Sequence, residues 1–179
     1  MRRLLVPALI GPMLFGPMLF GVAVLAGCER REARPEAPAS APKREADFRH
    51  RLEGDISGDY RPVVEAGEGW RVESLFIGQA SAFEAWEVGQ REASPLILTL
   101  AGPDGTVRFT PRAYALTDER LSLVAVAPGG REARLEARID PGALATARRN
   151  LGDRTPVISG TVTVEGVRRP VNLGWWNGD

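Results

Sequence analysis

The sequence predicts one mainly β domain, either an antiparallel β-sandwich or an open barrel, with one or two short helices. Three stretches support this prediction. Residues 132–139 alternate between charged and apolar side chains, which is the period of a strand with one buried face. Residues 96–100 form an apolar run that ends in the turn sequence Gly102-Pro103-Asp104-Gly105. Residues 156–173 hold two strand-like runs that meet at Glu165-Gly166, as expected for a hairpin.

The first strands are expected within residues 51–64 and 70–77, where apolar side chains recur along short runs. A helix is expected next. Ser81-Ala82-Phe83-Glu84 has the spacing of a capping box, and Phe83 would share a helix face with Trp86. Further along, Pro111 is expected to mark a sheet edge or a bulge, because proline cannot donate a ladder hydrogen bond.

A second helix is expected after the hairpin of residues 121–139. Asp140-Pro141 pairs an N-cap residue with proline at the first helical position, and Gly152 is expected just past the helix C-terminus. Arg148 and Arg149 lie near that C-terminus, where the helix macrodipole favours positive charge. We therefore assign these two arginines to helix stabilisation rather than to an anion site.

The N-terminal segment has the arrangement of a secretory signal peptide. Met1-Arg2-Arg3 is basic, residues 4–27 carry no charge, and small residues precede Cys28. Leu25-Ala26-Gly27-Cys28 resembles the lipobox of bacterial lipoprotein precursors. The resemblance implies that residues 1–27 are removed and that Cys28 is diacylated and N-acylated. Two or three acyl chains hold a protein on a bilayer, because each buried methylene contributes ~0.8 kcal/mol and one chain alone is marginal.

An uncleaved membrane-spanning helix is the alternative for residues 4–27, since ~20 apolar residues cross a hydrocarbon core. Pro12 and Pro17, in a doubled Gly-Pro-Met-Leu-Phe block, argue against it because proline breaks helices. Glu29 follows Cys28, and in lipoproteins of the resembled class Glu rather than Asp at this position favours the outer membrane. The expected location is the cell envelope, with the domain on the periplasmic side of the outer membrane.

Residues 28–48 are expected to form a disordered tether, and residues 49–179 the single folded domain. The tether is rich in alanine, proline and alternating charges, and such a composition buries too little apolar surface to offset the entropy of ordering. Proline-rich linkers are semi-extended at ~3.1 Å per residue, so the tether would hold the domain away from the bilayer. His50, the only histidine, lies at this boundary and is expected to be a solvated side chain.

Composition excludes several classes of partner. Removal of residues 1–27 takes away Arg2 and Arg3 and no acid, so the 23 basic side chains fall to 21 against 23 acidic ones. A net charge near −2 offers no basic excess for nucleic acid. Because Cys28 is the only cysteine, neither disulfides nor thiolate metal sites are expected. We expect no metal site and no cofactor.

The aromatic side chains are the strongest candidates for binding. Trp70, Trp86, Trp175 and Trp176 could line a pocket or a partner surface, as tryptophan often does. An ordinary β core is the alternative explanation. Trp175 and Trp176 would point to opposite faces of a strand. The leading expectation is a non-catalytic binding or assembly domain, with an envelope protein or a small apolar molecule as its partner and the membrane as its anchor.

No catalytic residue is predicted. A serine hydrolase needs a histidine or an equivalent base beside its nucleophile, and His50 lies outside the expected core. A cryptic hydrolase based on paired carboxylates is the third alternative. Its candidate acids are Asp55, Asp59, Glu84, Glu87, Asp118, Asp140 and Asp153. Most lie at expected turns and helix caps, where local hydrogen bonds explain an acidic side chain.

The C-terminal hairpin resembles the last strands of the YceI-like family. The similar residues are Gly160, the alternating strand that follows it, Gly166 and the return Arg169-Pro170-Val171-Asn172-Leu173, and residues 139–150 are similar to the segment ahead of those strands. The resemblance implies a lipocalin-like barrel that carries a small apolar ligand of the isoprenoid type, which is the second alternative for function.

The chain as a whole also resembles uncharacterised bacterial lipoproteins. That resemblance rests on Ser57-Gly58-Asp59-Tyr60, Leu75-Phe76-Ile77-Gly78-Gln79 and Trp175-Trp176-Asn177-Gly178-Asp179. It implies no particular activity.

Overall fold

The computed structural model describes residues 48–64, 67 and 69–178. The predicted signal peptide, Cys28 and the tether up to residue 47 lie outside the described residues. Residues 42–179 form one compact unit, and every residue of the described core belongs to it. This part of the chain therefore contains the packing that stabilises the fold.

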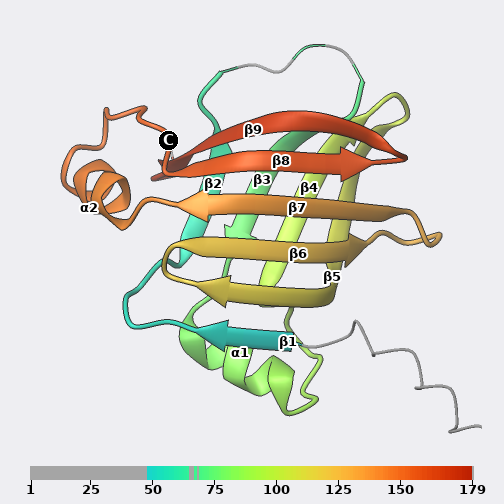
Figure 1. Cartoon of the computed structure of the whole chain (residues 1–179), viewed down its shortest axis with the longest axis horizontal. Coiled ribbons are helices and arrows are strands. Elements are labelled where there is room, and N and C mark those ends of the chain that lie inside the picture. Colours follow the sequence, from blue (N-terminus) through green and yellow to red (C-terminus); the bar gives the residue numbers. More distant parts are fainter. Residues whose placement is uncertain (1–47, 65–66, 68, 179) are drawn as a thin grey trace, which may run out of the picture. The chain divides into compact units, whose positions relative to one another are not determined.

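The described residues form nine strands and two helices, and the predicted β-rich fold is confirmed in its barrel form. The strands are β1 (Phe48–Arg51), β2 (Gly58–Pro62), β3 (Arg71–Ile77), β4 (Leu96–Gly102), β5 (Gly105–Thr117), β6 (Arg120–Val126), β7 (Glu132–Ile139), β8 (Ile158–Val164) and β9 (Val167–Trp176), and the helices are α1 (Ala80–Glu87) and α2 (Pro141–Arg149). Strands β2 to β9 close into an antiparallel barrel. Figure 1 shows β6 to β9 in front of the more steeply tilted β2 to β4.

The long strand β5 closes the barrel. Its first half, Gly105–Phe109, pairs with β4, and its second half, Thr110–Leu116, pairs with β6. The register shifts between Pro111 and Ala113, which confirms the predicted bulge at this proline. Strand β1 runs parallel to Tyr114–Thr117, on the edge of β5 that β4 has left. Within the range 51–64, where the first strand is expected, the structure has β2, whereas β1 ends at Arg51 and is not predicted by the sequence.

Helix α1 packs against β1 and buries Phe83 and Trp86, as the sequence predicts. The predicted capping box at Ser81 is wrong. The N-cap residue is Gln79, and it makes no side-chain cap hydrogen bond. Ser81 is the second residue of the helix, two positions after the N-cap, so it cannot accept from the free N–H groups of the first turn in the predicted way.

Helix α2 begins as predicted. The Asp140 side chain accepts a hydrogen bond of 2.9 Å from the Ala143 N–H, and Pro141 is the first helical residue. The predicted role of Gly152 is wrong, because the helix ends at Arg149 with Asn150 as the C-cap residue. Asn150 has an extended backbone, so the chain leaves the helix without a glycine in the left-handed conformation.

Apolar side chains fill the barrel interior. A side chain without accessible surface borders no void that admits water, and many inward-facing side chains are at most 1% exposed. They include Leu75, Ile77, Leu96, Leu98, Leu100, Phe109, Leu121, Leu123, Leu135, Ile158 and Leu173. The part of the interior that these residues occupy is a packed core.

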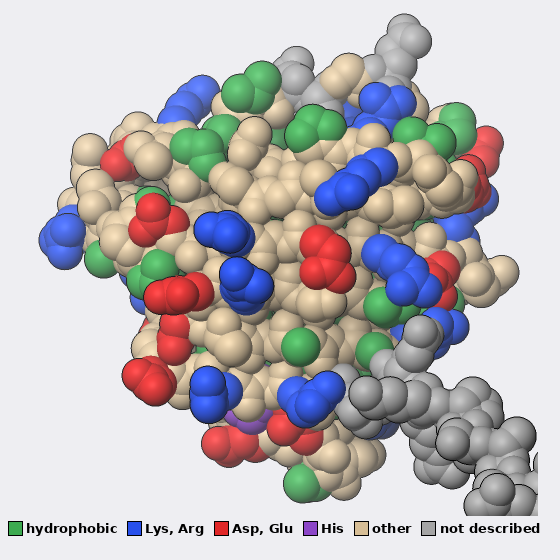
Figure 2. Space-filling view, in the orientation of Figure 1, with side chains coloured by type: hydrophobic (Ala, Val, Ile, Leu, Met, Phe, Trp, Pro, Cys, Tyr) green, Lys and Arg blue, Asp and Glu red, His purple; other side chains and the backbone are tan. Residues whose placement is uncertain are grey.

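The outer face of β7 is charged, as its alternating sequence predicts. Glu132 binds Arg112 on β5 and Arg134 two residues along its own strand, with N–O distances of 3.0 Å in both cases. Figure 2 shows basic and acidic side chains interspersed over this face. The pattern is that of a solvated sheet surface.

Candidate functional site

The four tryptophans do not form one surface. Trp86 lies on the buried face of α1, where Phe48 of β1 packs against its ring at a centroid distance of 6.1 Å. Trp70 precedes β3, and Trp175 and Trp176 end β9. No ring contact joins any two of the four. The four tryptophans predicted as binding candidates therefore lie at separate places in the fold.

Trp70 stabilises the end of the barrel where the hairpin turns lie. Its Nε1 donates to Glu165 at 3.2 Å, and Arg131 binds the same carboxylate at 2.9 Å while its guanidinium lies 4.7 Å from the Trp70 ring centroid. The neighbouring strand β4 contributes Gly102, where a side chain would collide with the Trp70 ring. Both the ring and its N–H are thus used in packing.

Trp175 and Trp176 lie on opposite faces of β9, as predicted. Trp175 pairs in register with buried Tyr60 and packs against Gly58. Trp176 lies on the outer face, where the Arg61 guanidinium stacks 3.3 Å from its ring centroid. Both rings are half-buried.

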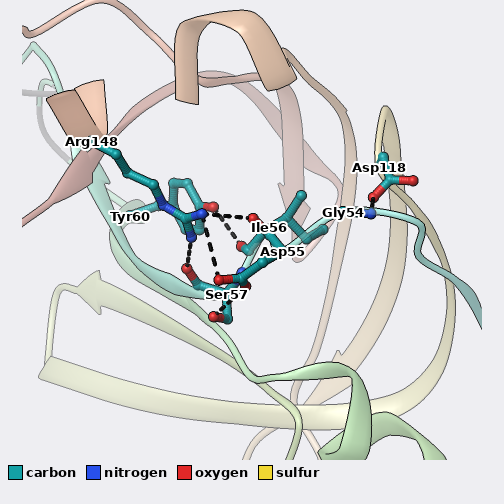
Figure 3. Close-up of polar contacts among 7 residues, drawn as sticks. All are labelled: Gly54, Asp55, Ile56, Ser57, Tyr60, Asp118 and Arg148. Atoms are coloured by element: carbon teal, nitrogen blue, oxygen red, sulfur yellow. Dashed lines mark hydrogen bonds and ion pairs between the residues drawn. The ribbon is translucent and has the colours of Figure 1, made fainter. Parts of the chain in front are cut away.

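Residues 53–57 cross the other end of the barrel, and we call this segment the strap. Figure 3 shows how Arg148 of α2 holds it. Arg148 Nη1 donates to the Asp55 carbonyl at 2.8 Å, and Nη2 donates to the Ser57 carbonyl at 2.7 Å. At the far end of the strap, the Asp118 carboxylate accepts from the Glu53 and Gly54 N–H groups at 2.9 and 3.0 Å.

The strap also enters the core. Ile56 is buried, and the Tyr60 hydroxyl donates to its carbonyl at 2.6 Å. Burial raises the pKa of Tyr60. The pKa of Asp55 is lowered, mainly by hydrogen bonds from the Ser57 hydroxyl and N–H and more weakly by the Arg148 charge. Arg148 therefore binds the strap, which goes beyond the helix-dipole role that the sequence suggested.

His50 is not the solvated side chain that the sequence predicts. It lies on β1 opposite Leu116, its side chain is 13% exposed, and its Nδ1 is 2.8 Å from Glu87 Oε1. The Tyr114 hydroxyl donates to the same oxygen at 3.2 Å. Burial, followed by the Glu87 charge, raises the pKa of Tyr114. The prediction failed because Glu87 and Tyr114 are distant from His50 in sequence.

Four of the acids considered as catalytic candidates make the turn or cap hydrogen bonds that the sequence predicts for them. Asp55, Asp118, Asp140 and Asp153 each accept from backbone N–H groups. Within the described ranges no group of three or more His, Cys, Asp or Glu side chains is placed to hold a metal ion. Neither described helix has the length and hydropathy of a membrane span.

A pocket lies in the barrel wall between β3 and β9, and we call it the seam pocket. Strand β2 ends at Pro62, so the first half of β9 has no strand partner on that side, and the chain re-enters the sheet at Arg71. The pocket has a volume of about 310 Å³. Its lining residues are Pro62, Val64, Gly67, Arg71, Val72, Val162, Arg169, Pro170, Val171, Asn172 and Leu173.

Among the described lining residues, those on the floor of the seam pocket are apolar and the charged ones on its rim are arginines. Val72 and Val171 are core residues that keep a small exposed area, 5% each, at the gap between the strands, whereas Leu173 behind the lining has no accessible surface. Arg71 and Arg169 are exposed. No described acidic side chain forms an ion pair with either arginine. An apolar floor beside two guanidinium groups can take a ligand that is itself partly apolar and partly anionic.

Arg169 occupies a position on the interior face of β9. It pairs in register with buried Val162, and the next pair on the same face joins Val171 to Gly160. Its neighbour Arg168 pairs with Thr163 and belongs to the outer face. Arg169 is not among the binding residues predicted from the sequence. Its signal was the break in the apolar alternation Val167, Arg169, Val171, Leu173.

In comparisons with known proteins, no family model, curated protein or solved structure matches this chain. The resemblances to bacterial lipoproteins and to the YceI-like family therefore stay predictions from the sequence.

Proposed function

We propose that this chain is an envelope lipoprotein, anchored through acylated Cys28, whose barrel is a non-catalytic binding domain on the periplasmic side of the outer membrane. The lipobox and the charge-free segment before it support export and anchoring. The Pro-rich tether supports a domain held away from the bilayer. The closed barrel supports a rigid binding domain with a preformed site.

The seam pocket is the observation that carries the binding function. Small-molecule sites are mostly apolar pockets of about 300–1,000 Å³ with a few placed polar groups, and this pocket lies at the small end of that range. Its lining contains no histidine, aspartate or glutamate among the described residues. Arginine stays protonated and serves poorly as a general base, so the pocket favours binding over acid–base chemistry.

The carrier function that the YceI-like resemblance implies is the second candidate, and the closed barrel favours it. The packed interior leaves the long isoprenoid chain no room along the barrel axis where Leu75, Leu98 and Leu135 lie. A ligand of this chain would instead be short and would bind in the seam pocket.

Intact-mass spectrometry of the protein from an exporting host tests the anchor. The expected product begins at Cys28 and carries the added mass of two or three acyl chains. In the Cys28→Ala control, processing at this site and the acyl mass are lost. A mature protein without acyl mass would contradict the anchoring proposal, and membrane fractionation of the wild type tests the outer-membrane assignment.

Native mass spectrometry of residues 42–179, exported and purified, tests the binding site. The expected spectrum contains an apolar mass that organic extraction removes. The substitutions Val171→Phe and Val72→Phe each add a bulky side chain at the floor of the pocket and should remove that mass. Val124→Phe, on the outer face of β6, is the control that should keep it. Pocket variants that fold, as judged by a cooperative thermal transition, and retain the ligand would exclude the seam pocket.

A further inference from the structure

The charge arrangement of the seam pocket indicates the chemistry of its ligand. Arg169 is the charged side chain in the run of inward register positions from Val167 to Leu173, and it lies where an apolar residue would continue the core. Its guanidinium lies against Gly69 in the loop before β3, and Nη2 is 3.0 Å from the position that a Cβ on Gly69 would occupy. Arg71 stands on the opposite wall of the same pocket.

A guanidinium group beside apolar surface selects a carboxylate. Arginine presents a planar fork of N–H donors that matches the two carboxylate oxygens, and such charge-assisted pairs are the strongest hydrogen bonds in proteins. The pocket beyond the fork is lined by Val72 and Val171, and an alkyl chain that leaves water there gains free energy from the burial of its own apolar surface. The two halves together match a carboxylate joined to an alkyl chain.

The pocket volume limits that chain. One water molecule takes up about 30 Å³ in the liquid, so 310 Å³ holds on the order of ten non-hydrogen atoms. One alkyl chain of medium length fits this volume.

We propose that the seam pocket binds a medium-chain fatty carboxylate, with the carboxylate on Arg169 and Arg71 and the alkyl chain on Val72 and Val171. This inference rests on the proposed binding function and adds the ligand class. It places the ligand in the barrel wall rather than along the barrel axis.

Calorimetric titration of residues 42–179 with octanoate and with 1-octanol tests the inference, because the two probes share a chain and differ in charge. The wild type should bind octanoate about tenfold more tightly than 1-octanol, the size expected of one charge-assisted hydrogen-bonded pair. Arg169→Gln should remove that preference and leave 1-octanol binding unchanged. Arg71→Gln should reduce the preference.

Arg168→Gln is the matched control, since it removes the same charge from the adjacent residue on the outer face of β9. It should keep the tenfold preference. An equal loss in Arg168→Gln and Arg169→Gln would show a general charge effect and would overturn the carboxylate site. Equal wild-type binding of both probes would overturn the ligand class while the binding function stood. Binding of neither probe would overturn both the ligand class and the proposed use of the pocket.

Discussion

Arg148 and Arg149 are adjacent, equally basic and placed in the last turn of α2, yet they differ in what they contact. Arg148 is half-buried and donates to two strap carbonyls, whereas Arg149 is exposed. The sequence predicts the same role for both, a favourable interaction with the helix macrodipole, because the strap is distant from both in sequence. The tertiary structure separates a residue that joins two elements from one that only borders a helix terminus.

Arg148→Ala is expected to lower the free energy of unfolding by about 1–3 kcal/mol, because it leaves two carbonyls without their charged donor. Arg149→Ala carries the same loss of helix-terminal charge and is expected to cost no more than about 0.5 kcal/mol, as surface substitutions do. Urea denaturation of both variants checks the difference. Equal losses would mean that the macrodipole, and not the strap, is what Arg148 stabilises.

Both tyrosines are expected to resist ionisation in the folded protein. Burial raises the pKa of Tyr60 and of Tyr114, and the Glu87 charge adds to the effect at Tyr114. Because the folded pKa lies above the unfolded value of about 10, each contributes stability that is present below about pH 10 and lost as the pH rises further.

An alkaline titration of phenolate absorbance checks this expectation. The folded protein should show no ionisation near pH 10, and the signal should appear together with the loss of circular dichroism. The same titration in urea is the control, where both side chains should ionise near their ordinary pKa. Early ionisation with retained circular dichroism would contradict the buried placement of at least one tyrosine.

At the scale of elements, the hairpins followed directly from the sequence. The β8–β9 turn uses Glu165 and Gly166, both with positive φ, which is the two-residue turn that a tight hairpin prefers. The predicted capping box is wrong because a serine can cap only from the N-cap position, and the helix begins two residues earlier than that box requires. The presence of this helix depends on many residues, whereas the position of its first residue depends on a single cap.

Gly160 is expected to be essential for the pairing of β7 with β8. A Cβ at this position would collide with the Glu136 carbonyl and lie 2.6 Å from the Ala137 Cα, and these are backbone atoms that cannot rotate away. Gly160→Ala is therefore expected to cost about 1–3 kcal/mol or more of unfolding free energy. The position is a register partner of Ala137, so the cost falls on the sheet itself.

Gly67→Ala is the matched control, since a Cβ there meets nothing within 4 Å. It is expected to change the unfolding free energy by less than about 0.5 kcal/mol, as for other exposed sites. Thermal and urea unfolding of the two variants give the comparison. A stable Gly160→Ala protein would show that the two strands can separate locally at little cost.

At the scale of the whole molecule, the barrel is expected to be stable without the tether. The described core lies entirely within residues 42–179, and this range forms one compact unit. Shortening the mature chain from residues 28–179 to residues 42–179 should change the unfolding free energy by less than about 0.5 kcal/mol. Paired urea denaturation of the two lengths checks it, and a larger loss would indicate that residues 28–41 contribute to the fold.

The sequence by itself determined the features that depend on neighbours along the chain. The strict alternation of residues 132–139, the turn at Glu165-Gly166, the bulge at Pro111 and the N-cap at Asp140 all follow from local geometry. The closed barrel was within the predicted fold classes because alternating strands with one apolar face must bury that face.

Only the tertiary structure decided which distant residues meet. His50 with Glu87, Arg148 with the strap, and Arg169 with Arg71 across the seam pocket are joined by strand order and by the early end of β2 at Pro62. No periodic pattern in the sequence predicts these contacts, since they depend on how long-range strand pairing closes the barrel. The four tryptophan candidates lie apart for the same reason. The sequence gives the type of each residue, whereas the pairing of the strands determines which side chains it contacts.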